Sequence, residues 1–351
     1  MKSSRKTKVL IVLSLLAIAT ATYFVLRPKN LIQDEKNKLA QTLANDEKIL
    51  KNEKEASERE IYSALVRLGD HNNLLSKQEA LKRMQNPSAV IRKGAAEALG
   101  FFLEDQDSKT ALATLLADED PIVRLAAINA HSRRGGNGKI EILEKLLAQK
   151  GPNNKIQWND LEKANLYIGI LRLAKGDAKA SKLPPLLALY KSTKDVQTKN
   201  EILIHVMSQV PKNPSVLDLV ENEALKSSEA LIITQAIRHI AAIREKRLAE
   251  KLGDFLQSPH LPVRMALVQS LFMACPSNRI QILERTIEKD PQPEVRKQAI
   301  EQIAILGGDE ANTLLERLTK NTQLNPDDLS LVQSTLKNWK KSEKNIDRCA
   351  L

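Results

Sequence analysis

Apolar residues recur along most of the chain with the three-to-four-residue spacing of amphipathic helices, and short polar turns interrupt the pattern. Four segments align without gaps on an arginine that follows isoleucine or valine: Arg92, Arg124, Arg264 and Arg296. Six residues before each arginine stands a short polar residue, which suits a turn or a helix N-cap. The pattern predicts a repeated unit in which a turn leads into a helix with the arginine near its start.

The spacing of these arginines predicts how many units there are. Arg92 and Arg124 are 32 residues apart, as are Arg264 and Arg296, and the 140 residues from Arg124 to Arg264 equal four units of 35. The pattern in that gap predicts helix pairs at 138–149 with 157–175, 182–192 with 194–209, 214–226 with 228–243, and 245–257 with the helix after Pro262. We therefore predict an all-α fold, an α-solenoid of about eight helical hairpins over 74–340.

The polar turn, the arginine after valine or isoleucine, and the small apolar residue that follows resemble HEAT repeats, including the short bacterial variety related to bilin lyases. In that family an aspartate and an arginine of successive repeats form a ladder. Four residues match this pattern: Asp118, Arg124, Asp290 and Arg296. Asn86 and Ser258 replace the aspartate before Arg92 and Arg264, so the resemblance implies a structural ladder that is interrupted at those two arginines.

The N-terminal 1–29 segment differs from the repeats. Residues 9–26 are 18 uncharged, mostly apolar residues, near the lower limit for crossing a bilayer, and four basic residues precede them. This predicts a transmembrane signal anchor, a cytoplasmic N-terminus and an extracytoplasmic body, periplasmic in a bacterium. A signal peptide cleaved after the small residues 19–21 is the alternative. A charged helical stalk over 30–73 would precede the solenoid, and a polar tail over 341–351 would follow it.

The net charge of +11 changes this picture little. Residues 1–29 contain six basic residues and no acidic ones, which leaves 48 basic against 43 acidic residues in the body. Aromatic residues make up only 3% of the chain, so stacking platforms for single-stranded nucleic acid are scarce. Nucleic acid is therefore a disfavoured partner.

No catalytic or cofactor-binding motif is found in the sequence. None of the five histidines is followed by glutamate, and no phosphate-binding loop or nucleophile elbow occurs. We therefore predict no enzyme activity, no cofactor and no metal site, although His205 and His239, 34 residues apart, could be neighbours. Cys275 and Cys349 have no metal-ligand spacing; they are either a buried small residue with a tail thiol or a disulfide.

The remaining candidate is a basic surface at the ends of the second helices. The predicted partner-binding residues are Arg133, Arg134, Arg172, Arg238 and Arg244. Cations are also favoured at helix C-termini by the macrodipole, which is the competing explanation. We expect a membrane-anchored, non-catalytic scaffold that binds a protein partner outside the cytoplasm. The alternatives are a bilin-lyase-like enzyme or maturation factor, which the resemblance raises, and a module that binds an anionic polymer.

Overall fold

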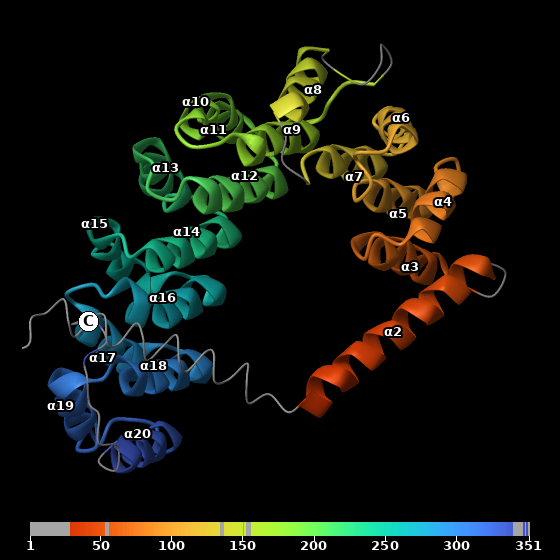
Figure 1. The fold of residues 1–351 in the computed structure, drawn as a ribbon. Helices are drawn as coiled ribbons and strands as arrows, with labels where there is room; N and C mark the ends of the chain where they lie inside the picture. The colour runs from red at the N-terminus through yellow and green to blue at the C-terminus, as the bar shows by residue number, and fades with distance from the viewer. Residues whose placement is uncertain are drawn as a thin grey trace, which may run out of the picture. The chain divides into compact units, whose positions relative to one another are not determined.

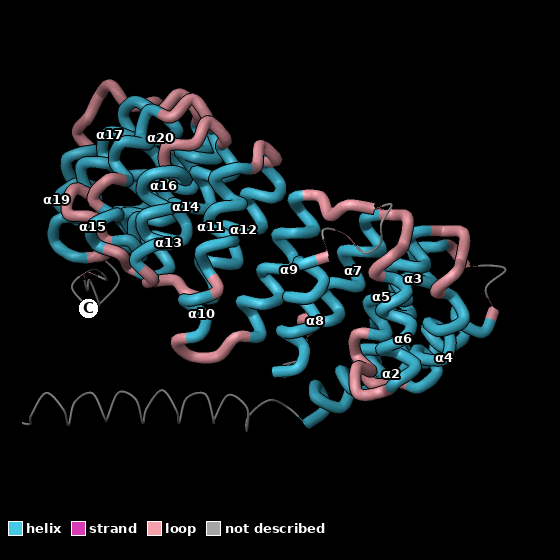
Figure 2. The backbone as a smooth tube through the Cα atoms, turned by 90° about the horizontal axis from the view of Figure 1, so that it is seen from above, coloured by secondary structure: helices cyan, strands magenta, loops and turns pink. Residues whose placement is uncertain are grey.

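The computed structural model describes residues 29–52, 56–133, 137–149, 151, 156–339, 347 and 349, and these residues form helices and turns without a β-strand (Figure 1). The chain divides into two compact units, Met1–Arg134 and Gly135–Leu351, which we call the first and the second unit. Helices and their connecting loops make up both of them (Figure 2).

The first unit is built from paired helices. They are α2 (Lys29–Lys51), α3 (Glu58–Asp70), α4 (Leu74–Arg83), α5 (Ala89–Leu99), α6 (Gln106–Leu115) and α7 (Pro121–His131). Helices α3, α5 and α7 pack in succession. Helix α2 packs on α3, α4 packs on α3 and α5, and α6 packs on α5 and α7. The segment predicted as a stalk thus contains a helical hairpin, in which Arg67 of α3 donates two hydrogen bonds, of 2.8 and 2.9 Å, to Asp46 of α2.

The second unit continues the same pattern. Its helices are α8 (Asn137–Ala148), α9 (Asp160–Leu173), α10 (Ala178–Ser181), α11 (Leu183–Ser192), α12 (Val196–Gln209), α13 (Pro214–Leu219), the π-helical turn η2 (Val220–Ala224), α14 (Ala230–Ile243), α15 (Lys246–Ala249), the 3₁₀ turn η3 (Leu252–Gln257), α16 (Leu261–Ala274), α17 (Arg279–Lys289), α18 (Pro293–Leu306), α19 (Gly308–Leu318) and α20 (Pro326–Trp339). Helices α9, α12, α14, α16, α18 and α20 pack one after another as the second helices of successive hairpins. Fully buried aliphatic residues such as Ile237, Leu267 and Ile300 fill the space between them.

After the α2–α3 hairpin, the described part of the chain contains eight more, from α4–α5 to α19–α20, and the predicted pairing of the middle segments is confirmed. Turn chemistry explains why their helices begin where they do. The Asp120 carboxylate accepts a hydrogen bond from the Ile122 N–H, and Pro121 occupies the first helical position, where a missing N–H costs least. Asp195 caps α12 in the same way through the Thr198 N–H.

At three places an arginine of one hairpin binds an aspartate of the next, through Arg92, Arg264 and Arg296. Arg264 donates to Asp290 of the following turn at 2.8 and 3.3 Å, and Arg296 donates to Asp328 at 2.6 Å. The residue six before the arginine contributes its backbone carbonyl, as Ser258 does to Arg264 at 2.8 Å. The expected interruption at Arg92 and Arg264 is therefore wrong. The aspartate that binds each arginine comes from the next repeat, and the turn before the arginine supplies only a backbone carbonyl.

The transmembrane helix in the predicted fold class needs correction. Within the described residues, no helix has both the length and the apolar character that a bilayer crossing requires. The longest, α2, has 23 residues but is charged along its length. This finding contradicts the predicted anchor and the single-pass membrane localisation, and neither is carried further. The 9–26 segment to which the anchor was assigned lies outside the described residues.

Candidate functional site

Two of the five predicted partner-binding arginines belong to the first unit. Arg133 donates to the Glu97 carbonyl at 2.9 Å, and its guanidinium lies 4.2 Å from the centre of the Phe101 ring. These contacts tie the residues after α7 to the end of α5, so Arg133 has a structural role. Arg134 lies outside the described residues.

The other three predicted arginines belong to the second unit. Arg172 is half-buried in the last turn of α9. Arg238 is exposed on α14, and Arg244 is the exposed, left-handed residue (φ 53°) that ends that helix. The structure thus places Arg238 in the second half of α14 and Arg244 directly after that helix. Their role in binding stays a prediction.

The two histidines that are about one repeat apart, His205 and His239, contact different partners. His239 is buried in α14 with its Nε2 3.3 Å from the Pro211 carbonyl oxygen, and burial lowers the pKa of its imidazole from the usual 6.5. His205 on α12 instead lies 3.5 Å from the Glu201 carboxylate. In the part of the chain that the structure describes, no three His, Cys, Asp or Glu side chains gather to hold a metal ion.

A groove of about 600 Å³ lies in the second unit between two consecutive hairpins. One wall is the turn from η3 into α16, residues 256–259. The other wall is the C-terminal half of α17 with the turn into α18, residues 285–292. Arg264 of α16 also lines it, so the ladder pair Arg264–Asp290 connects the two walls.

This ladder pair is satisfied within the protein. Both Asp290 carboxylate oxygens accept from Arg264, and one of them also accepts the Gln292 N–H at 2.9 Å. The two charges cancel and the side chains are almost fully buried, 8% and 2% exposed. The pair therefore holds the walls in place and is not itself available to a ligand.

The charges that remain in the groove come from α17. Arg285 and Lys289 are exposed, one helical turn apart, and line the groove. The glutamates of the same helix interact with the following hairpin, because Glu284 pairs with Arg317 at 2.6 Å and Glu288 accepts from Asn321 at 3.1 Å. Helix α17 thus directs these two glutamates to one neighbour and Arg285 and Lys289 to the groove. Its first residue, Arg279, pairs instead with Glu310 of the following hairpin.

A second groove, of about 680 Å³, lies in the first unit between α2 and α3. Its lining has nearly balanced charge: three cations, Lys38, Arg59 and Arg67, stand against Asp46 and Glu60. Arg67 is bound by Asp46, and Glu60 accepts hydrogen bonds from Ser57 that lower the pKa of its carboxyl. The lining of this groove therefore has a smaller net charge than the lining of the groove beside α17.

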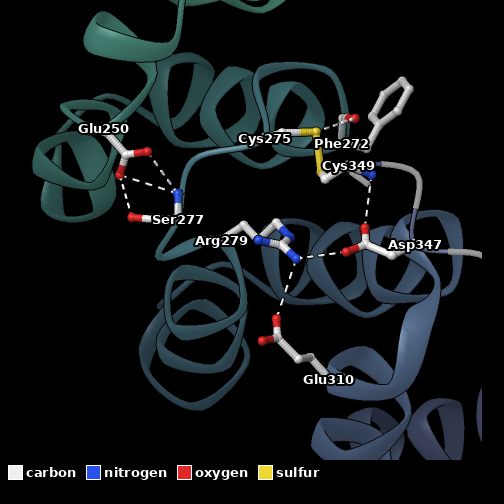
Figure 3. The surroundings of a disulfide bond; sticks show 8 residues. All are labelled: Glu250, Phe272, Cys275, Ser277, Arg279, Glu310, Asp347 and Cys349. Carbon is white, nitrogen blue, oxygen red and sulfur yellow. Dashed lines mark hydrogen bonds and ion pairs between the residues drawn. A yellow bond between two sulfur atoms is a disulfide. The ribbon is translucent and has the colours of Figure 1, made fainter. Parts of the chain in front are cut away.

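Cys349 forms a disulfide with Cys275, the residue that ends α16 (Figure 3). Asp347 accepts the Arg279 guanidinium at 3.0 Å and the Cys349 N–H at 2.8 Å. Gly308 leaves the space that Asp347 occupies, since an added Cβ would lie 2.9 Å from the Asp347 Cβ. Of the two alternatives for the cysteines, the structure has the disulfide.

Sequence reasoning missed the α17 groove, although a signal was present. The run Glu284–Arg285 and Glu288–Lys289 repeats an acid followed by a base at a four-residue interval, which puts the two acids on one side of a helix and the two bases beside them. What the sequence could not show is that the acids are taken by the next hairpin.

Comparison with known proteins defines the class of this fold. Residues 78–156 match the family model of HEAT repeats, which confirms the resemblance for that segment. A sequence search of curated proteins found no match. Among solved structures, the X-ray structure of YibA from Escherichia coli is similar, with a TM-score of 0.53 and 15% identity over 82% of this chain and 98% of that one. At this identity the likeness shows the fold alone.

Two other solved structures align with lower scores. An engineered protein aligns with a TM-score of 0.37 and 18% identity, covering 84% of this chain and 88% of that one. Human deoxyhypusine hydroxylase in complex with glycerol aligns with a TM-score of 0.33 and 15% identity, covering 88% of this chain and 99% of that one. No functional argument is drawn from either.

Proposed function

We propose that this protein is a non-catalytic helical-repeat scaffold that binds a protein partner through the groove between the α15–α16 and α17–α18 hairpins. The observation that supports this most is the pair of exposed cations, Arg285 and Lys289, in a groove of about 600 Å³. HEAT repeats in residues 78–156 agree with such a role, because stacked helical repeats present extended binding surfaces.

The groove is suited to binding because its walls are held before a partner arrives. The Arg264–Asp290 pair connects the two walls, and Pro259 and Pro291 restrict the backbone of the two turns. A preorganised surface loses less conformational entropy on binding than a loop that must first be ordered.

Site-specific photocrosslinking in the full-length chain tests this proposal. A photoreactive amino acid at Gln257, on the rim of the groove, should give a discrete adduct with one protein in cells. The matched position is Gln269, which is exposed on α16 but does not line the groove. The adduct should disappear when Arg285→Glu is added. Equal adducts from both positions, or none from Gln257, would contradict the proposal.

A further inference from the structure

We infer that the groove beside α17 takes an extended acidic segment of the partner, with two carboxylates separated by one residue. This inference rests on the proposed function and specifies the chemistry of the partner. It follows from three properties of the groove: its uncompensated charge, the spacing of its cations and the polar groups around them.

The first property is an excess of positive charge. The charged residues of the lining are Arg264, Arg285, Lys289 and Asp290, and the first and last of these neutralise each other. Among the ion pairs and hydrogen bonds of the described residues, none neutralises Arg285 or Lys289. An occupant with carboxylates would complement these two cations.

Lys289 alone would not support the inference. It ends α17, where the helix macrodipole favours a cation in any case. Arg285 lies a full turn earlier, where that effect has faded, and Glu284 beside it is paired with Arg317. Arg285 therefore contributes a planar guanidinium that can bind a carboxylate through two hydrogen bonds.

The spacing of the two cations sets the spacing of the acids. Residues four apart on a helix have Cβ atoms about 5–6 Å apart. In an extended segment, alternate residues lie on the same face and are separated by about 6.6 Å. An acidic residue of the segment can therefore reach Arg285 with its carboxylate, and the acidic residue two positions later can reach Lys289. Adjacent acids would point to opposite sides of the segment.

The third property is the polar rim. The amides of Gln257 and Gln292 are exposed on opposite walls, and each can both donate to and accept from the backbone of an extended segment. The lining contains no aromatic residue. Nucleobases therefore have no aromatic side chain in the groove on which to stack, so a peptide fits it better than a single-stranded nucleic acid.

Fluorescence anisotropy with the full-length chain tests the inference. The probe is a labelled peptide of serine and glycine with a central Glu-Ser-Glu. The comparison peptides are Gln-Ser-Gln, and a peptide of the same composition with its two glutamates five residues apart. We expect the Glu-Ser-Glu peptide to bind at least about tenfold more tightly than either, with an affinity that falls as salt is added.

Two double variants with the same change in net charge locate the binding. Arg285→Glu with Lys289→Glu should weaken the Glu-Ser-Glu peptide by at least about tenfold and should bind a Lys-Ser-Lys peptide instead. Lys191→Glu with Lys212→Glu should leave the affinity within about twofold, because these exposed residues lie outside the groove. All four residues are exposed, so circular dichroism should show both variants folded.

Several outcomes would overturn the inference. They are equal binding of the three peptides, equal losses in the two double variants, or tighter binding of a labelled oligothymidylate than of the Glu-Ser-Glu peptide. If the Glu-Ser-Glu peptide fails to bind while the Gln257 crosslinking adduct persists and depends on Arg285, the scaffold proposal stands and only the acidic segment is wrong. If the adduct also fails, the scaffold proposal falls with it.

Discussion

Arg92 of α5 and Asp118 of the turn before α7 form a bidentate ion pair, with Nε to Oδ2 at 2.7 Å and Nη2 to Oδ1 at 2.8 Å. Both side chains are buried, 9% and 8% exposed, and the hydrogen bond to Asp118 raises the pKa of the Arg92 guanidinium. The pair joins one hairpin to the next. The same relationship recurs between Arg264 and Asp290, so the ladder pairs hold these hairpins against their neighbours.

Asp118→Ala should destabilise the first unit by about 3 kcal/mol, because it leaves the buried Arg92 charge without its carboxylate. The Asn86 and Pro87 carbonyls still accept hydrogen bonds from Arg92, so the loss of stability should lie at the low end of the range for a broken buried ion pair. Chemical denaturation followed by circular dichroism measures it. Glu119→Gln is the control, since Glu119 is 90% exposed and 3.8 Å from Arg92, and it should change the stability by less than about 0.5 kcal/mol. Equal losses in the two variants would contradict the ladder's role.

Reducing the Cys275–Cys349 disulfide should lower the free energy of unfolding of the second unit by roughly 2–4 kcal/mol, because the bond closes a loop over a sequence separation of 74. Denaturation with and without a thiol reductant measures the change. The Cys275→Ser, Cys349→Ser double variant should have the lower stability under both conditions. If the reductant also lowered the stability of this variant, the disulfide would not be the cause of the change.

Stability should fall as the pH is lowered through the titration of His239. Burial lowers the pKa of this imidazole below 6.5, so the unfolded chain takes up the proton first. The contribution is fully present above about pH 6.5 and is lost as the pH falls through the lower, folded-state pKa. His239→Gln should remove this part of the pH dependence in thermal melts between pH 7.5 and 5. If the melting temperature of the variant changed with pH as that of the unsubstituted protein does, His239 would not contribute to the pH dependence of stability.

Gly100→Ala should disturb the packing of α5 on α7. A Cβ at this position would lie 2.8 Å from the Cβ and 3.1 Å from the Cα of Ala130, which is fully buried in α7. Overpacking of this kind costs about 1–3 kcal/mol, measurable by thermal denaturation. Gly253→Ala provides the comparison, because its nearest neighbour is the end of the Asn278 side chain at 3.2 Å, which can move. A larger loss at Gly253 would contradict this packing.

The repeat architecture was predictable because its signal is local. Apolar spacing, turn residues such as Asp120 and proline at the first helical position all act within one hairpin, so the predicted pair 214–226 with 228–243 corresponds to α13–η2 and α14. The ladder was harder to predict, because the acid that binds Arg264 stands 26 residues later, in the next repeat.

Contacts between distant residues account for what the sequence did not reveal. The 74-residue separation of Cys275 and Cys349 along the chain says nothing about the distance between them in space. Likewise, the cations of α17 stand out only once Glu284 is seen to pair with Arg317. The predicted Arg133 illustrates the reverse case, since its contacts to Glu97 and Phe101 give it a structural role.

Hydrogen exchange of the full-length chain, with and without the Glu-Ser-Glu peptide, tests the central claim most directly. If the groove beside α17 is the binding site, backbone amides in 256–260 and 285–292 should exchange more slowly with the peptide present, and those of 238–244 should not change. The Arg285→Glu, Lys289→Glu variant should show no protection. Protection confined to 238–244, or protection that persists in that variant, would contradict the account.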